Sequence, residues 1–174
     1  MKFAPDIRKT RLDSPLGPII LAATDAGLAG LWFDDQKHQP AWQDWPDRND
    51  DPTLLQSIAE LQQYFDGARA TFGLPLDLRG GTPFQQSVWQ ALLQVPFGVC
   101  TTYGSLGVVL DKPRAVRAVG TAVGRNPLGI IVPCHRVLGA DGSLTGYAGG
   151  LGRKAALLTL ESGARRAGQP EPTA

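Results

Sequence analysis

The segment 130–137 places a cysteine, a histidine and an arginine next to one another at the end of an apolar run. A thiolate is the attacking form of cysteine, and most free thiols are protonated near neutral pH. The imidazole of His135 could therefore act as the base for Cys134, either directly or through one water. We interpret Cys134 as a candidate nucleophile and His135 as its candidate base.

A histidine base needs a third group, usually a carboxylate, that fixes its tautomer and orientation. Acidic residues are scarce in the carboxyl-terminal half of the chain. Glu161 follows an apolar helical stretch at 157–160, so packing would carry its carboxylate inward. Asp141 lies instead in a Gly-rich turn, and Glu171 lies in a polar tail. Glu161 is therefore the candidate third group.

The Cys-His pair alone does not establish a catalytic site. Adjacent side chains on an extended segment point to opposite faces, and a buried cysteine is often an ordinary core residue. We expect the second cysteine, Cys100, to be such a packing residue. The chain has no Cys-x-x-Cys pair, and its two histidines lie far apart in sequence. These patterns indicate no metal site, and we expect no cofactor.

Two short helices are predicted upstream of the cysteine. Thr82-Pro83-Phe84-Gln85 is a capping box that begins a preceding helix, which ends near 96–98. Thr102 can cap a second helix over 103–110, and a tight turn at 111–113 leads to a third helix over 113–124. Two short helices joined by such a turn are typical of a helix-turn-helix, whose second helix lies on DNA.

The second helix of this pair has a candidate DNA-binding face. Arg114, Arg117 and Thr121 have the spacing of one helical face, and Ala118 is among the small residues between them. Small side chains allow close approach to a groove, while arginines meet phosphates or enter the base stack. The alternative is a solvated face whose arginines only aid solubility.

The amino-terminal half predicts a small sheet with one helix. Residues 18–33 form a hairpin signal about the turn 24–27, and Asp51 with Pro52 begins a helix that ends near Gly67. Alternation over 72–78 predicts another strand. We therefore expect an α/β (α+β) fold of two domains. Residues 1–80 form a structural α/β domain, and residues 81–174 form a mainly helical domain with a mobile tail after about 163.

Composition and charge limit the classes of function. The 174 residues are 43% hydrophobic and 19% charged, which is typical of a globular protein. No apolar run is long enough to cross a bilayer and the first residues lack a signal-peptide pattern, so we expect a cytoplasmic protein without a membrane partner. Residues 1–80 carry 8 basic and 12 acidic side chains, whereas residues 81–174 carry 9 and 4. A basic carboxyl-terminal half suits a polyanion such as DNA.

Several motifs in the second half resemble one family when they are taken together. They are, in chain order, Thr82-Pro83-Phe84-Gln85 with Val88-Trp89, Thr102-Tyr103-Gly104, Arg117-Ala118-Val119-Gly120, Asn126-Pro127, Pro133-Cys134-His135-Arg136-Val137, Gly146-Tyr147-Ala148-Gly149-Gly150, and Leu157-Leu158 with Glu161. The chain closely resembles the O6-alkylguanine-DNA alkyltransferase family over about 82–161. Residues 14–33 are similar to the family's more variable amino-terminal domain.

The resemblance implies a reaction and a partner. A chain of this kind flips a damaged nucleotide out of double-stranded DNA and moves an alkyl group, such as methyl, from O6 of guanine to Cys134 once per molecule. O4 of thymine is a second candidate position from which the alkyl group could be removed. The resemblance implies a monomer in solution, with cooperative assembly on DNA as a further expectation.

The resemblance also assigns roles to individual residues. His135 and Glu161 resemble the relay that ionises Cys134 through a water, and Asn126 resembles the residue that braces the active-site turn. Tyr103 is similar to a tyrosine that protonates the leaving guanine and crowds the DNA backbone, and Arg117 to a finger that fills the vacated stack. The remaining DNA-binding candidates are Arg114, Thr121 and Ala118. The candidate pocket residues are Pro133, Val137, Tyr147 and Ala148.

Three alternatives use the same features differently. A cysteine hydrolase could use Cys134, His135 and Glu161 with turnover, and it would need neither Arg117 nor a helix-turn-helix. A non-catalytic alkylated-DNA-binding module shares the scaffold, but such proteins replace the acceptor cysteine. A DNA-binding regulator would use the helix pair alone. Cys134 argues against the second alternative, and the arginine-bearing helix argues against the first.

Overall fold

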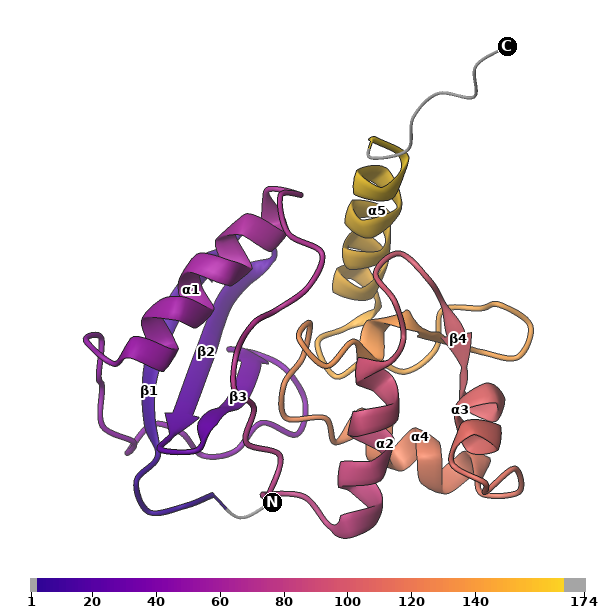
Figure 1. The fold of residues 1–174 in the computed structure, drawn as a ribbon, viewed down its shortest axis with the longest axis horizontal. Coiled ribbons are helices and arrows are strands. Elements are labelled where there is room, and N and C mark those ends of the chain that lie inside the picture. Colours follow the sequence, from indigo (N-terminus) through magenta and orange to yellow (C-terminus); the bar gives the residue numbers. More distant parts are fainter. Residues whose placement is uncertain (1–2, 168–174) are drawn as a thin grey trace.

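The computed structural model describes residues 3–167, and for 165–167 it describes the backbone only. The N-terminal domain is an antiparallel sheet of three strands in the order β1 (Arg8–Ser14), β2 (Gly17–Thr24) and β3 (Gly27–Phe33). Helix α1 (Pro52–Phe65) packs on one face of this sheet, as Figure 1 shows. The predicted hairpin over 18–33 is confirmed by β2 and β3, while β1 was not predicted because its sequence is mostly polar.

Helix α1 begins where the sequence predicts. The Asp51 side chain accepts a hydrogen bond from the Leu54 N–H at 3.0 Å, and Pro52 occupies the first helical position, where its missing N–H is not needed. The helix ends at Phe65, just before Gly67, whose φ of 74° is readily adopted only by glycine. Both ends of this helix are thus fixed by local sequence.

The strand predicted at 72–78 does not form as a regular element. Leu28 exchanges backbone hydrogen bonds with Pro75 and Asp77, both at 2.8 Å, which gives only an isolated bridge to Leu76. Pro75 has no N–H and cannot extend a ladder. The segment therefore lies along β3 without becoming a fourth strand. At Gly27 a Cβ would lie 2.4 Å from the Pro75 carbonyl oxygen, so only glycine fits there.

The second domain is mainly helical, as predicted. Its elements are α2 (Pro83–Leu93), β4 (Thr101–Thr102), α3 (Tyr103–Val109), α4 (Val116–Gly124), the 3-10 turn η1 (Cys134–Arg136), β5 (Val137–Leu138) and α5 (Leu151–Ala167). The predicted capping box at Thr82 and Gln85 is present. The buried Trp89 donates its indole N–H to the Ala122 carbonyl at 2.9 Å and so fixes α2 against α4.

Helices α3 and α4 pack against each other as the predicted helix-turn-helix, at the lower right of Figure 1. The second helix begins at Val116, however, and not at Pro113. The Ala115 N–H bonds to the Lys112 carbonyl at 2.9 Å and closes a turn, so the helical hydrogen bonds start only at Val119. Arg114 therefore lies in the turn before α4, and its predicted place on the helical face of Arg117 is wrong.

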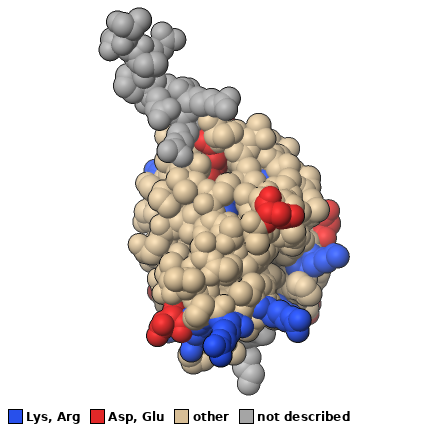
Figure 2. Space-filling view, turned by 90° about the vertical axis from the view of Figure 1, so that its right-hand side faces the viewer, with Lys and Arg blue, Asp and Glu red and all other residues tan. Residues whose placement is uncertain are grey.

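Exposed basic side chains surround this helix pair. They are Lys112, Arg114, Arg117 and Arg125. Figure 2 shows lysine and arginine side chains gathered toward the lower edge of the helical domain's face. Asp111 is the one acidic residue of the segment 103–125, so the helix pair carries a net positive charge, as expected for contact with a polyanion.

Helix α5 runs further than predicted. It continues through Gly163 to Ala167, so residues 164–167 belong to the helix and not to the predicted tail. One glycine in a helix costs only about 1 kcal/mol, and the alanines and arginines after it are good helix formers. The remainder of the predicted tail, 168–174, lies outside the described residues.

The two domains share one hydrophobic core. Side chains of β3, α1, α2, α4 and the segment 128–132 are buried together in a single cluster. The backbone of Leu31 on β3 also bonds to Pro127 at 2.8 Å and to Gly129 at 3.2 Å. The segment that leads to Cys134 is therefore held along the edge of the N-terminal sheet.

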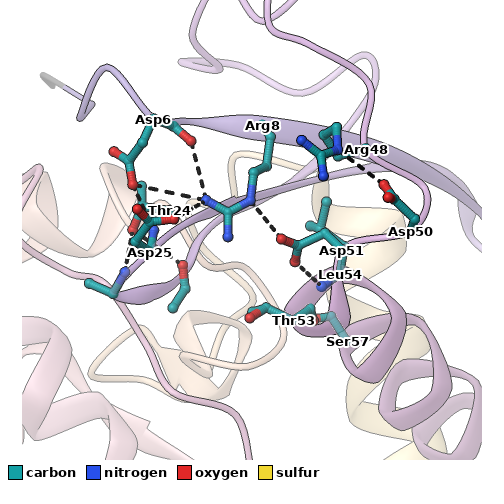
Figure 3. A network of polar contacts seen from close by, with 12 residues as sticks. Asp6, Arg8, Thr24, Asp25, Arg48, Asp50, Asp51, Thr53, Leu54 and Ser57 are labelled. Carbon is teal, nitrogen blue, oxygen red and sulfur yellow. Dashed lines mark hydrogen bonds and ion pairs between the residues drawn. The ribbon is translucent and has the colours of Figure 1, made fainter.

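A polar network ties the outer strand to the helix and to the hairpin turn. Arg8 on β1 donates to Asp51, the cap of α1, at 2.6 Å and to Asp25 in the turn at 2.8 Å (Figure 3). The hydrogen bond from Arg8 and that from the Leu54 N–H outweigh the effect of burial and lower the pKa of Asp51. The network therefore links β1 to both the start of α1 and the turn between β2 and β3.

Candidate active site

Cys134 lies at the start of η1 and is 8% exposed. The Asn126 side-chain amide donates one hydrogen to the Cys134 sulfur at 3.0 Å and the other to the Val132 carbonyl at 2.8 Å. Its oxygen accepts from the Leu128 N–H at 3.0 Å. One buried side chain thus uses all its hydrogen-bonding groups to hold the turn that carries the thiol.

His135 and Glu161 form a buried pair behind the cysteine. The distance between His135 Nε2 and Glu161 Oε1 is 2.8 Å, and both side chains are fully buried. The other ring nitrogen, Nδ1, has no hydrogen-bond partner within the described part of the chain. An ionised carboxylate only accepts, so the proton sits on Nε2 and leaves the lone pair of Nδ1 available.

Glu161 is surrounded by donors from three other parts of the chain. Arg136 reaches both carboxylate oxygens, with Nε and Nη2 each at 2.9 Å. The Tyr64 hydroxyl on α1 and the Gly98 N–H before β4 each donate at 2.9 Å. A carboxylate held by several donors stays ionised even when it is buried. The arrangement is a fixed negative charge behind the imidazole.

The pKa values of the three groups follow from these contacts. Burial alone would raise the pKa of Glu161, but the hydrogen bonds from His135 and Arg136 lower it to about 2. Burial lowers the pKa of His135, and Glu161 opposes this effect. Burial raises the pKa of the Cys134 thiol, against the hydrogen bond from Asn126 and the charge of Lys154. The resting pair is therefore a neutral imidazole beside a protonated thiol.

Lys154 is a buried cation that was not predicted as part of the site. Its ammonium donates to the carbonyls of Val137 and Thr145, both at 2.5 Å, and burial lowers its pKa. The spacing of Lys154 and Glu161 on α5 is seven residues, which places both on one helical face. That spacing was the signal in the sequence that could have indicated Lys154.

Tyr64 was also missed, and no signal in the sequence could have indicated it. It lies on a helix of the N-terminal domain, 97 residues before Glu161. That domain was expected to be structural only. The structure shows that it contributes a hydrogen bond to the buried pair.

Cys134 belongs to the hydrophobic core cluster and also lines a pocket. This pocket, the Cys134 pocket, is lined by Gln36, Val123, Gly124, Asn126, Gly129, Cys134, Gly146, Tyr147, Ala148 and Gly149. A second pocket, the outer pocket, is lined by Lys37, His38, Tyr103, Gly120, Gly124, Gly146, Tyr147 and Ala148. The two share four residues. They therefore adjoin, and the outer pocket is lined by residues of α3, α4 and the loop after β3.

Tyr103 lines the outer pocket. Its hydroxyl lies 3.4 Å from the Thr145 carbonyl and 3.5 Å from that of Gly146. Its ring lies against Gly120 on α4, where a Cβ would be 3.8 Å from a ring carbon. The Tyr103 side chain thus lies between α4 and the loop that contains Thr145 and Gly146 and lines the pocket.

The structure brings together some of the predicted pocket residues and separates others. Tyr147 and Ala148 line both pockets, but Pro133 lines a different cavity beside Arg136. Val137 is fully buried in the core and lines neither pocket. The 3-10 turn at 134–136 is the reason, because it turns successive side chains to different sides.

The predicted DNA-binding residues all lie on the surface. Arg117, Ala118 and Thr121 are exposed on α4, and Arg114 is exposed in the turn before it. The Thr121 hydroxyl donates to the Arg117 carbonyl at 3.0 Å. Cys100, by contrast, was expected to be buried and is exposed, because it lies just before the edge strand β4.

We expect Tyr64→Phe to destabilise the fold by about 2 kcal/mol, because hydrogen bonds to charged groups contribute about 1.5–3 kcal/mol. Urea unfolding measures this change. Ser162→Ala is the control: it removes an exposed hydroxyl one residue after Glu161 and should change the free energy of unfolding by less than about 0.5 kcal/mol. If both variants unfold like the parent, the tyrosine hydroxyl does not stabilise the carboxylate.

Within the described residues 3–167, the structure shows neither a membrane-spanning helix nor a cluster of metal ligands. No helix there has the length and apolar composition needed to cross a membrane. In the same part of the chain, no three His, Cys, Asp or Glu side chains gather as metal ligands would.

A buried Cys-His-Glu set beside a helix-turn-helix is the arrangement expected of a DNA-binding protein with a candidate cysteine nucleophile, and two family models match this chain. The model of the 6-O-methylguanine DNA methyltransferase ribonuclease-like domain matches residues 7–78. The model of the 6-O-methylguanine DNA methyltransferase DNA binding domain matches residues 83–163. The chain belongs to the 6-O-methylguanine DNA methyltransferase family.

Individual relatives agree over most of their length. The methylated-DNA–protein-cysteine methyltransferase of Mycobacterium leprae is 47% identical over 150 residues, which cover 86% of this chain and 89% of that protein. The constitutive methyltransferase of the same name from Bacillus subtilis is 43% identical and covers 87% and 93%.

Solved structures agree as well. The O6-methylguanine methyltransferase of Mycobacterium tuberculosis has a TM-score of 0.83 at 43% identity, covering 95% of this chain and 96% of that one. The Mycobacterium tuberculosis protein OGT in complex with DNA has a TM-score of 0.81 at 44% identity, covering 91% and 93%. The predicted fold class and family are both confirmed.

Proposed function

We propose that this chain repairs alkylated DNA by moving one alkyl group from O6 of guanine to the sulfur of Cys134, once per molecule. The observation that supports this most directly is the position of Cys134. Its thiol lines a pocket that adjoins the outer pocket beside α3 and α4, and a buried His135–Glu161 pair lies behind it. Relatives named as methylated-DNA–protein-cysteine methyltransferases, and one solved in complex with DNA, support the choice of substrate.

The proton of the thiol moves first. Glu161 is ionised and holds the proton of His135 on Nε2, so the Nδ1 lone pair is the acceptor. One bridging water carries the proton from Cys134 to Nδ1, and the new imidazolium is stabilised by Glu161. The positive charge of Lys154 and the amide hydrogen of Asn126 stabilise the thiolate that remains.

The thiolate then attacks the alkyl carbon. A sulfur–carbon bond forms while the bond between that carbon and O6 breaks, and the electron pair leaves with the guanine. Tyr103 at the pocket mouth donates a proton to the ring of the leaving base, which makes the guanine a better leaving group. The product on Cys134 is a thioether, which water does not readily cleave, so each molecule acts once.

The lesion must leave the helix before it can meet the sulfur. The alkyl carbon on O6 lies inside the duplex, and extrusion of a base costs a few kcal/mol. Arg117 on the exposed face of α4 fills the vacated stack, and Arg114, Thr121 and Ala118 approach the groove or its phosphates. All these residues belong to one chain, which supports action by a monomer. Cooperative assembly on DNA, activity on O4-alkylthymine and a cytoplasmic location stay predictions.

We expect Arg117→Ala to slow transfer from duplex DNA about tenfold, because about 1.4 kcal/mol of compensation for unstacking is lost. Transfer from the free base O6-methylguanine should be unchanged. Single-turnover rates measure both. The control is Arg48→Ala, which removes an exposed arginine beside the start of α1 and should leave both rates unchanged. An equal loss on the duplex and on the free base would contradict the stacking role of Arg117.

A mass measurement tests the proposed reaction. The protein is incubated with a duplex oligonucleotide that contains O6-methylguanine, and its peptides are then weighed. One methyl group on the Cys134 peptide, with no more than one lesion repaired per molecule, supports the proposal. Repeated turnover would favour the cysteine hydrolase, and binding without transfer would favour a non-catalytic damage-binding module. Methyl found only on Cys100 would overturn the choice of acceptor.

A further inference from the structure

The loop after β3 belongs to the N-terminal domain but reaches the pocket of the other domain. The Lys37 N–H donates to the Ala148 carbonyl at 3.1 Å, which joins the loop to the wall of the Cys134 pocket. Asp35 forms an ion pair with Arg153 on α5 at 2.7 Å. The Gln36 side chain accepts from the Phe33 N–H at 3.0 Å. The loop is therefore fixed at Lys37 and at the two residues before it.

The same loop lines both the Cys134 pocket and the outer pocket. Gln36 lines the Cys134 pocket, and Lys37 and His38 line the outer pocket together with Tyr103 and Gly120. Both Lys37 and His38 are exposed. His38 has a φ of 65°, a left-handed conformation that is uncommon for a residue with a side chain, although histidine adopts it more often than most.

The charge of Lys37 has no partner within the described residues. The two acidic residues nearest in sequence are engaged elsewhere, since Asp34 pairs with Arg11 at 3.4 Å and Asp35 with Arg153 at 2.7 Å. An ammonium group at the mouth of a pocket, with neighbouring carboxylates already neutralised, is suited to an anion from outside the chain. The anion that must come to this pocket during repair is the phosphodiester of the extruded nucleotide.

We propose that the loop 34–40 is part of the DNA-binding surface and that Lys37 contacts a backbone phosphate beside the extruded nucleotide. This inference rests on the proposed function. It gives the N-terminal domain a direct role in substrate binding, across the pocket mouth from the recognition helix. DNA would then be held from two sides, by α4 and by this loop.

The test compares DNA affinity at several salt concentrations. Binding to a duplex with O6-methylguanine is measured in the Cys134→Ala background, where no transfer occurs. Lys37→Met keeps the length of the side chain but removes its charge. It should weaken binding about fivefold near 0.15 M salt and reduce the slope of log affinity against log salt by about 0.9, as expected for one lost phosphate contact. Lys37→Arg should retain both values.

The matched control is Arg48→Met. Arg48 is an exposed cation of the same domain that pairs with Asp50 at 3.0 Å beside the start of α1 (Figure 3). This variant should bind like its parent. If Lys37→Met does so too, the inference is overturned.

A second measurement separates this inference from the proposed function. With Cys134 present, Lys37→Met should react with the free base O6-methylguanine as fast as the unsubstituted chain does. An equal loss on the free base would show that the loop shapes the pocket, and would overturn the phosphate contact. Failure of the unsubstituted chain to transfer methyl at all would refute the proposed function. The slope of log affinity against log salt would still show whether Lys37 contacts a phosphate.

Discussion

Cys134→Ala is expected to abolish alkyl transfer and to leave affinity for O6-methylguanine duplexes nearly unchanged. The variant lacks the sulfur that forms the new bond, so the thioether cannot form. The alanine fills a site that is already 8% exposed beside a pocket, so the fold should tolerate the change. Loss of methyl from DNA and gel-shift affinity measure the two properties.

Cys100→Ser is the control for this prediction. Cys100 is the other thiol of the chain and is exposed, so a reagent or alkyl donor in solution can reach it. Its replacement should leave transfer from DNA intact. Residual transfer by Cys134→Ala that disappears in the double variant would mean that the exposed thiol is an acceptor.

The local parts of the fold could be predicted because local contacts determine them. The cap at Asp51, the box at Thr82 and the cap at Thr102 all act within three residues of a helix start. The hairpin over 18–33 depends on a two-residue turn. Each of these elements begins within about one residue of its predicted position.

The errors in the fold arise where individual backbone hydrogen bonds decide the structure against the pattern of residue types. The stretch 72–78 has strand-like alternation, but its pairing with Leu28 ends at Pro75. The start of α4 depends on a turn closed by Lys112 and Ala115, which composition does not indicate. Neither outcome can be deduced from periodicity.

The candidate site shows the same division. Cys134, His135 and Glu161 could be chosen from residue type and from the resemblance, and the structure brings His135 and Glu161 within 2.8 Å. Tyr64 and Lys37 come from the other domain, and contacts between the domains place Tyr64 at Glu161 and Lys37 at the outer pocket. The roles of all these residues stay predictions until the variants are measured.

Glu161→Gln should reduce the rate of alkyl transfer by about a hundredfold to ten-thousandfold, the range associated with general base catalysis and with loss of the carboxylate behind a histidine. Glutamine has nearly the same shape, but its neutral amide cannot stabilise an imidazolium. Its NH2 group would also face the donors of Arg136 or His135. Single-turnover kinetics on a duplex substrate measure this loss. Glu60→Gln on α1, whose carboxylate pairs with Arg69 at 3.4 Å, is the control and should transfer normally.

Glu161→Gln should also lower the free energy of unfolding by about 3–5 kcal/mol at pH 7, because the guanidinium of Arg136 is left buried without its counter-ion. The pKa of Glu161 is about 2 in the folded chain, compared with 4.5 for a glutamate free of these contacts, which is the value taken for the unfolded chain. A lowered folded pKa stabilises the protein above the unfolded value, and this contribution is lost as pH falls through the folded value. The difference between Glu161→Gln and the parent should therefore narrow from about pH 4.5 toward pH 2. A difference that stays constant over this range would contradict an ionised Glu161.

A double variant separates stability from catalysis. In Glu161→Gln with Arg136→Met, the uncompensated cation is gone, so part of the lost stability should return. Transfer should stay as slow as in Glu161→Gln, because His135 still lacks the charge that holds its proton on Nε2. Recovery of transfer together with stability would show that the carboxylate only keeps the fold intact, and would remove it from the proton relay.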